Sequence, residues 1–135
     1  MRSRSASNLW AFFVLTLLFA VGVGQRQAVA QKVYWTDRDN ATLSVTDLSS
    51  GQTQVLVTNT GGRLQDVDLD ASTGILYFSD WGPVGPPGSQ GSINQVNSDG
   101  TGLAPVCAPG TLGDAVHQLA LDPVNSQIYF TRAVS

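Results

Sequence analysis

The chain has 135 residues, which suggests a single domain, and its charge comes from ten acidic and seven basic residues. Every acidic residue is an aspartate, only one lysine is present and glycine occurs 14 times, so the composition favours strands and turns over helices. The basic residues form no cluster in the sequence, which argues against a nucleic-acid-binding protein.

The first thirty residues have the layout of a secretory signal peptide. Two arginines near the start precede an uncharged, apolar stretch over residues 9–23, and Ala28-Val29-Ala30 gives the small-x-small pattern before Gln31. The apolar stretch is about 15 residues long, whereas a bilayer span needs about 20. We therefore expect cleavage before Gln31 and export of the rest. An uncleaved membrane anchor and a cut near residues 22–24 are the alternatives.

The remainder of the chain contains an internal repeat of about fifty residues. Residues 64–80 match residues 116–132 without a gap at an offset of 52, and residues 33–37 match the last five residues of the first copy at an offset of 43. Residues 41–57 match residues 91–107 at an offset of 50. The offsets differ only where glycine and proline cluster, which is typical of loops.

Each unit reads as four short strands separated by turn signals. In chain order, the predicted strands are Val33–Thr36, Thr42–Asp47, Thr53–Thr58, Asp66–Leu69, Leu76–Ser79, Ser92–Asn97, Leu103–Cys107, Gln118–Leu121 and Ile128–Thr131. Four strands per unit at this period are typical of β-propeller blades. The sequence therefore predicts an all-β fold of about two four-stranded blades. The first unit lacks its leading strand, and the last ends in the second strand of a third blade.

One copy of the repeat carries a family motif. Tyr34-Trp35-Thr36-Asp37 is the tetrapeptide that names the YWTD repeat, and the chain from Lys32 to Ser135 resembles this family, the class B repeat of low-density lipoprotein receptors. The copies Tyr77-Phe78-Ser79-Asp80 and Tyr129-Phe130-Thr131-Arg132 replace tryptophan by phenylalanine, and the last replaces aspartate by arginine. The resemblance implies a propeller of six blades, of which residues 31–135 form a part.

The motif residues are expected to be structural, both by the resemblance and on physical grounds. The aromatic rings are large and rigid, and would bury apolar area between blades. The hydroxyl groups of Thr36, Ser79 and Thr131 can tie neighbouring backbones together. The carboxylates of Asp37 and Asp80 can close a strand and accept turn N–H groups. Two further aspartates, Asp70 and Asp122, end the apolar strand that precedes each motif copy.

Three aspartates on one predicted strand deserve a separate interpretation. Asp66, Asp68 and Asp70 alternate along the strand, so they point to one face, while Val67 and Leu69 point to the core. Three carboxylates in a row could hold Ca²⁺. We favour a solvent-facing or channel-facing side instead, because the matching strand of the next unit has Gln118 and Ala120 in place of Asp66 and Asp68.

The single cysteine, histidine and glycosylation motif complete the candidates. Cys107 is either buried or paired with another chain, and we favour burial. His117 lacks the neighbours that a catalytic or metal site requires, so we expect an ordinary strand residue. Asn40 begins an N-glycosylation acceptor, Asn40-Ala41-Thr42, in a loop after a strand.

These observations predict a secreted, non-catalytic binding module without a metal or other cofactor. Its partner would be a protein ligand or further propeller blades, and it would meet a membrane only through an uncleaved leader or as part of a longer receptor. The alternatives are a fragment of a secreted propeller enzyme, resembling lactonases or strictosidine synthase, and a truncated product without independent function.

Overall fold

The computed structural model describes residues 31–58, 62–82, 90–113 and 115–132. The predicted signal peptide, residues 1–30, lies outside the described residues, as does Asp114.

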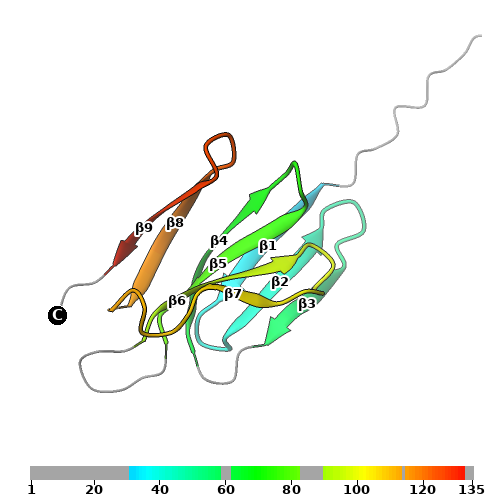
Figure 1. The fold of residues 1–135 in the computed structure, drawn as a ribbon. Helices are drawn as coiled ribbons and strands as arrows, with labels where there is room; N and C mark the ends of the chain where they lie inside the picture. The colour runs from blue at the N-terminus through cyan, green and yellow to red at the C-terminus, as the bar shows by residue number, and fades with distance from the viewer. Residues whose placement is uncertain (1–30, 59–61, 83–89, 114, 133–135) are drawn as a thin grey trace, which may run out of the picture.

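The described residues form three antiparallel sheets and no helix. The first sheet, blade 1, has the order β1-β2-β3, the second, blade 2, β4-β5-β6-β7, and the third, blade 3, β8-β9. The strands are β1 (Lys32–Asp37), β2 (Thr42–Asp47), β3 (Thr53–Thr58), β4 (Leu64–Asp70), β5 (Ile75–Asp80), β6 (Ser92–Asn97), β7 (Ala104–Cys107), β8 (Val116–Asp122) and β9 (Gln127–Arg132). Figure 1 shows the three sheets side by side, with β4 and β8 on neighbouring blades. The all-β, blade-type prediction is therefore confirmed.

The strand bounds follow the sequence pattern closely. Strands β2, β3 and β6 have the predicted bounds, while β4 and β8 begin two residues earlier than predicted. Strand β7 begins at Ala104, so the prediction that it begins at Leu103 was wrong by one residue. Leu103 is exposed and precedes the strand. The turn before β7 also lies close to blade 1: a Cβ added at Gly100 would come 3.2 Å from the carbonyl oxygen of Leu56, and φ there is 89°. Both features favour glycine.

The main apolar core lies between blades 1 and 2. Its buried members are Leu43 and Val57 from blade 1 and Leu64, Leu76, Phe78 and Val96 from blade 2. Burial of one such side chain stabilises the fold by about 1.5–3 kcal/mol. Blade-to-blade packing therefore provides much of the stability.

Repeat-equivalent aromatic residues differ sharply in burial. On β5, Leu76 and Phe78 pack in the core with blade 1, whereas the hydroxyl of Ser79 reaches blade 3. At the position equivalent to Phe78, Trp35 of β1 is 39% exposed, while Phe78 itself is 1% exposed. Val33, beside Trp35 on the same face of β1, is also exposed. The exposed face of β1 is therefore the repeat counterpart of the β5 face that carries Leu76 and Phe78, which is buried against blade 1.

The two equivalent positions predict different costs of truncation. In the full chain, Phe78→Ala should lower the free energy of unfolding by about 3–5 kcal/mol because it opens a cavity in the core. Trp35→Ala should cost at most about 1.5 kcal/mol, chiefly through the lost hydrogen bond from Trp35 Nε1 to Thr46 Oγ1, 3.1 Å long. Urea unfolding measures both. An equal cost would contradict the open face of blade 1.

Candidate functional site at the loop end of the blades

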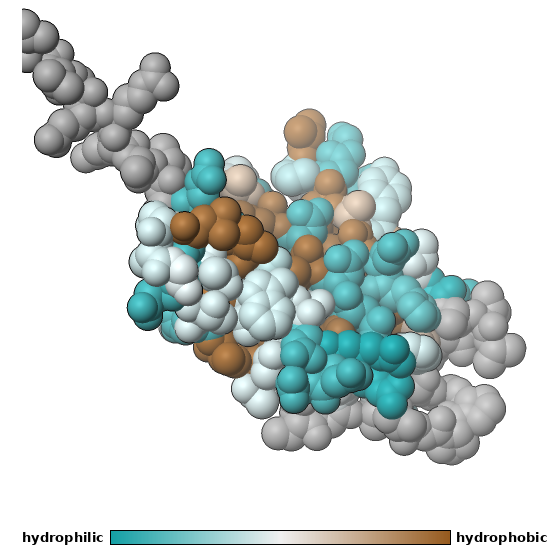
Figure 2. Space-filling model, turned by 180° about the vertical axis from the view of Figure 1, so that it is seen from behind, coloured by the Kyte–Doolittle hydropathy of each residue, from teal (hydrophilic) through white to brown (hydrophobic). Residues whose placement is uncertain are grey.

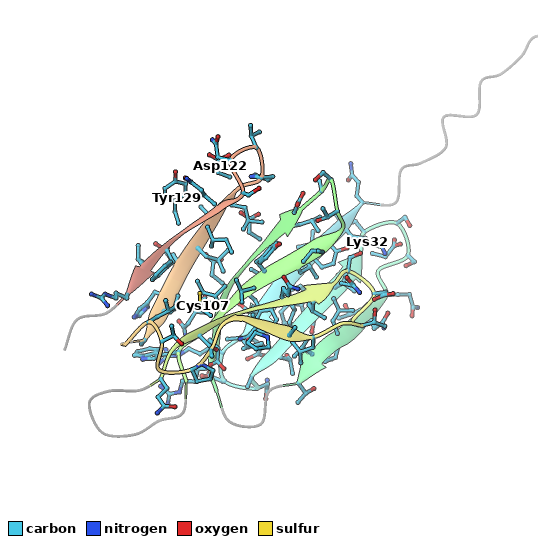
Figure 3. All side chains as sticks on the ribbon, viewed as in Figure 1. Lys32, Cys107, Asp122 and Tyr129 are labelled. Atoms are coloured by element: carbon cyan, nitrogen blue, oxygen red, sulfur yellow. The ribbon has the colours of Figure 1, made fainter. Side chains whose placement is uncertain are left out.

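The two ends of the sheets carry different side chains. We call the end with the turns after β2, β4, β6 and β8 the turn end, and the opposite end the loop end. The turn end carries Asp47, Asp70, Asp99 and Asp122 with Lys32, whereas the loop end carries Arg38, Arg63 and Arg132 together with Asp37, Asp39 and Asp80. Figure 3 shows Asp122 at the turn end and Cys107 toward the loop end. The ends therefore differ in the charges that they offer to a partner.

The turn-end aspartates are part of the turns themselves. Asp70, for example, accepts a 2.9 Å hydrogen bond from the backbone N–H of Ser72. The hydroxyl of Ser72 and then its N–H lower the pKa of Asp70, because both donate to the charged form. The pKa of each of the other three is likewise lowered, first of all by a side-chain donor two or three residues ahead. The role of these carboxylates is therefore to close the turns.

At the loop end, three blades contribute to one cluster around Trp81. This residue directly follows β5, and its ring lies 5.0 Å from the guanidinium carbon of Arg38 and 5.9 Å from that of Arg63. The ring of His117, from β8, packs against it with 4.8 Å between centroids and a 46° tilt. A cation over a tryptophan face contributes about 0.5–2 kcal/mol. Figure 2 shows hydrophilic side chains gathered at the lower end of the molecule, which is the loop end in both views.

The buried carboxylate of Asp80 fixes the backbone on both sides of this cluster. It accepts hydrogen bonds from the backbone N–H of Arg63, at 2.9 Å, and of Gly82, at 2.8 Å. The N–H of Trp81 in turn donates to the carbonyl oxygen of Arg63, at 2.9 Å. A Cβ added at Gly62 would collide with both carboxylate oxygens of Asp80, so the chain approaches the carboxylate too closely for any other residue. Arg63 and Trp81 are thus positioned through their backbones.

His117 also borders a polar cavity of about 450 Å³. Its lining residues are Gln65, His117, Gln118, Thr131 and Arg132. The guanidinium of Arg132 donates to the carbonyl oxygen of Leu112 at 3.0 Å, which holds it against the loop before β8. The Nε2 atom of Gln65 is buried and has no hydrogen-bond partner. Because His117 borders both regions, the Trp81 cluster and the cavity form one surface.

Asp66 and Asp68 join β4 to β8. Asp66 accepts the N–H of Val67 with Oδ1 and that of Leu119 with Oδ2, each at 3.0 Å. Asp68 does the same for the N–H of Leu69, at 2.8 Å, and of Leu121, at 3.0 Å.

These contacts correct the sequence interpretation of this strand. The two half-buried side chains point at the backbone of blade 3 instead of toward solvent or an open channel. Asp70, the third of the row, serves its own turn. Among residues 31–58, 62–82, 90–113 and 115–132, no three His, Cys, Asp or Glu side chains are grouped so that they could hold a metal.

The motif hydroxyls lie where inner strands meet. The Ser79 hydroxyl accepts the N–H of Asp66 at 3.1 Å and donates to the carbonyl oxygen of His117 at 2.6 Å, so it joins β4, β5 and β8. Its repeat equivalent, Thr131, accepts the N–H of Gln118 at 3.1 Å in blade 3. Thr36 is half-buried on β1.

The aromatic motif residues fall into two groups. Tyr34 packs against the core between blades 1 and 2, and Tyr77 lines the space between blades 2 and 3. Tyr129 and Phe130 on β9 are exposed, by 59% and 40%. Figure 3 shows Tyr129 on the outermost strand, away from the other blades.

The remaining residues singled out from the sequence are Asp37, Asn40 and Cys107. The backbone N–H of Asn40 and then its side-chain amide lower the pKa of Asp37, which accepts both at 3.0 and 2.8 Å. Asn40 is exposed on the β1–β2 turn, close in sequence to Arg38. Cys107 is a free thiol and half-buried, so the prediction of a buried cysteine was only partly right.

Sequence reasoning missed the Trp81 cluster and treated His117 as an ordinary strand residue. The only available signal was a tryptophan immediately after a motif copy. Arg38 comes from blade 1, Arg63 from the segment before β4 and His117 from blade 3, at positions that are not equivalent to one another in the repeat, so no spacing in the sequence linked them.

No family model matches the sequence. The structure is similar to a chain in a crystal structure of the nidogen/laminin complex, with a TM-score of 0.64 and 24% sequence identity. The match covers 76% of this chain and 36% of that chain. The described residues are blades of a β-propeller. No helix in the part of the chain that the structure describes is long and apolar enough to cross a membrane.

Proposed function

We propose that the chain is a non-catalytic, extracellular protein-binding module, and that its partner contacts the loop-end surface around Trp81. The observation that carries the proposal is the placement of Arg38 and Arg63 over the Trp81 ring, with His117 packed against it. Tryptophan and arginine are the residue types most enriched at the energetic centres of protein interfaces. The structural neighbour, solved in a complex of nidogen with laminin, supports a protein partner.

The finer parts of the proposal rest on the sequence. They are YWTD-type blades belonging to a six-bladed ring, removal of residues 1–30 on export, and a glycan on Asn40. The exposure of Asn40 on a turn is compatible with modification, because one N–H of its amide would remain available for Asp37.

Expression of the full chain in a secreting eukaryotic cell tests these points. Mass spectrometry of the medium should find a chain that starts at Gln31 and loses the mass of an N-glycan on enzymatic deglycosylation. Asn40→Gln should abolish that mass difference and serves as the control. Recovery of a chain that still starts at Met1 in the membrane fraction would contradict the proposed export.

Binding by surface variants tests the proposed site. The secreted chain is measured against laminin and a panel of other purified extracellular proteins. Trp81→Ala and Arg63→Gln should each weaken binding to any partner by about tenfold or more, as expected for residues at an interface centre. Lys32→Gln, at the opposite end, is the matched control and should leave the affinity unchanged.

Two results would contradict the proposed site. One is a chain that binds none of these proteins, and the other is a partner whose affinity falls with Lys32→Gln but not with Trp81→Ala.

A further inference from the structure

Blades 1 and 3 pack on opposite sides of blade 2, and the two contacts follow one rule. Leu76 and Phe78, on one side of β5, pack against blade 1, whereas Tyr77, on the other side, lines the space beside blade 3. Tyr34, the repeat equivalent of Tyr77, packs from blade 1 against the first contact. We call the side of a blade that carries its motif tyrosine the tyrosine side, and the opposite side the reverse side. In both contacts, the tyrosine side of one blade meets the reverse side of the next.

The reverse side of blade 1 is open among the residues that the structure describes. Val33 and Trp35 stand at the repeat positions of the buried pair on β5, but they are 45% and 39% exposed. Val55 lies across β2 from Trp35 and is 52% exposed, so the apolar surface extends to β3. This surface is the equivalent of the one that blade 2 buries against blade 1.

The tyrosine side of blade 3 is open as well. Tyr129 stands at the repeat position of Tyr34 and Tyr77, and it is 59% exposed. Ala120, its cross-strand neighbour on β8, is also exposed. Blades 1 and 3 therefore present the two halves of the contact that the chain already forms twice internally.

We propose that the chain binds a second copy of itself head to tail, with the tyrosine side of blade 3 against the reverse side of blade 1 in the next copy. The second copy is the partner that fits, because this contact would continue the blade-to-blade interface in which Tyr34 packs on the equivalents of Val33 and Trp35. Between the strand ends, neither open side carries a charged residue, so the acidic composition does not oppose the contact.

Such a contact is heterologous, because different surfaces of the two copies meet. A head-to-tail pair keeps one free half at each end, so it either closes into a ring or grows. The inference goes beyond the proposed function, since it uses the sides of blades 1 and 3 and leaves the loop-end cluster around Trp81 to another partner.

Sedimentation velocity of the secreted full chain over a range of concentrations tests the proposal. The unaltered chain should form dimers or larger species whose share rises with concentration. Val33→Asp and Tyr129→Asp each place a charge in one half of the contact, and each should weaken association by at least about tenfold. Leu103→Asp makes the same charge change at an exposed residue outside both sides, so it is the matched control and should leave association unchanged.

A mixture of the two variants tests the head-to-tail arrangement itself. Val33→Asp keeps an intact tyrosine side on blade 3, and Tyr129→Asp keeps an intact reverse side on blade 1. An equimolar mixture should therefore form a one-to-one pair that does not grow, although each variant alone stays monomeric. Circular dichroism checks that both variants are folded, and Trp35→Ala or Tyr129→Ala replaces a charged variant that is not.

Three results would overturn the inference: an unaltered chain that stays monomeric, single variants that associate as the unaltered chain does, and a mixture of folded variants that stays monomeric. Normal association of Tyr129→Asp together with loss of association in Val33→Asp would indicate a symmetric contact between two reverse sides, and would also overturn it.

Discussion

Two carboxylates connect the inner strands of blades 2 and 3, and the position of blade 3 and of the loop-end surface depends on that connection. Strands β4 and β8 belong to different sheets, so no β-ladder pairs their facing N–H groups. A buried N–H group without an acceptor is costly, and nearly all such groups in proteins are paired. Asp66 and Asp68 solve this problem by accepting N–H groups from both strands. Each hydrogen bond to a charged acceptor contributes about 1.5–3 kcal/mol.

The geometry of these contacts follows the internal repeat. Val67 and Leu119 are 52 positions apart and share the carboxylate of Asp66, and the N–H groups of Leu69 and Leu121, with the same spacing, share that of Asp68. The carboxylates therefore fix which residue of one blade stands beside which residue of the next. This register brings the carbonyl oxygen of His117 to the Ser79 hydroxyl and the His117 ring to Trp81. The loop-end surface is a consequence of the same alignment.

Much of the fold could be predicted because local rules decide it. The internal repeat, with strand-forming residues between turn signals, predicted every described strand. The site could not be predicted in this way. The motif residues Asp37 and Asp80 are equivalent in sequence, yet Asp37 closes a tight exposed turn while Asp80 is buried beneath Gly62 and positions two loops. Their environments differ because Gly62 and Arg63, just before β4, approach Asp80, and no described segment takes the corresponding place beside Asp37.

The same limit explains the misjudged row of aspartates. An alternating pattern places Asp66 and Asp68 on one face of a strand, but it does not identify the backbone that they face. The next unit has Gln118 and Ala120 at these positions, which suggested a dispensable feature. In the structure, Asp66 and Asp68 lie on β4, and they accept the N–H groups that β8 of blade 3 presents to that strand.

Native-state hydrogen exchange at Leu119 and Leu121 tests the central claim most directly. The full chain carrying Asp66→Asn and Asp68→Asn keeps the size of both side chains but replaces one acceptor oxygen of each with an NH₂ group that cannot accept. The account predicts that the amides of Leu119 and Leu121 exchange at least about tenfold faster than in the unaltered chain. The amides of the β5–β6 pair should keep their protection, and Asp39→Asn, in an exposed turn, should change neither. Unchanged protection of Leu119 and Leu121 in the double variant would contradict the claim that these carboxylates hold the blades together.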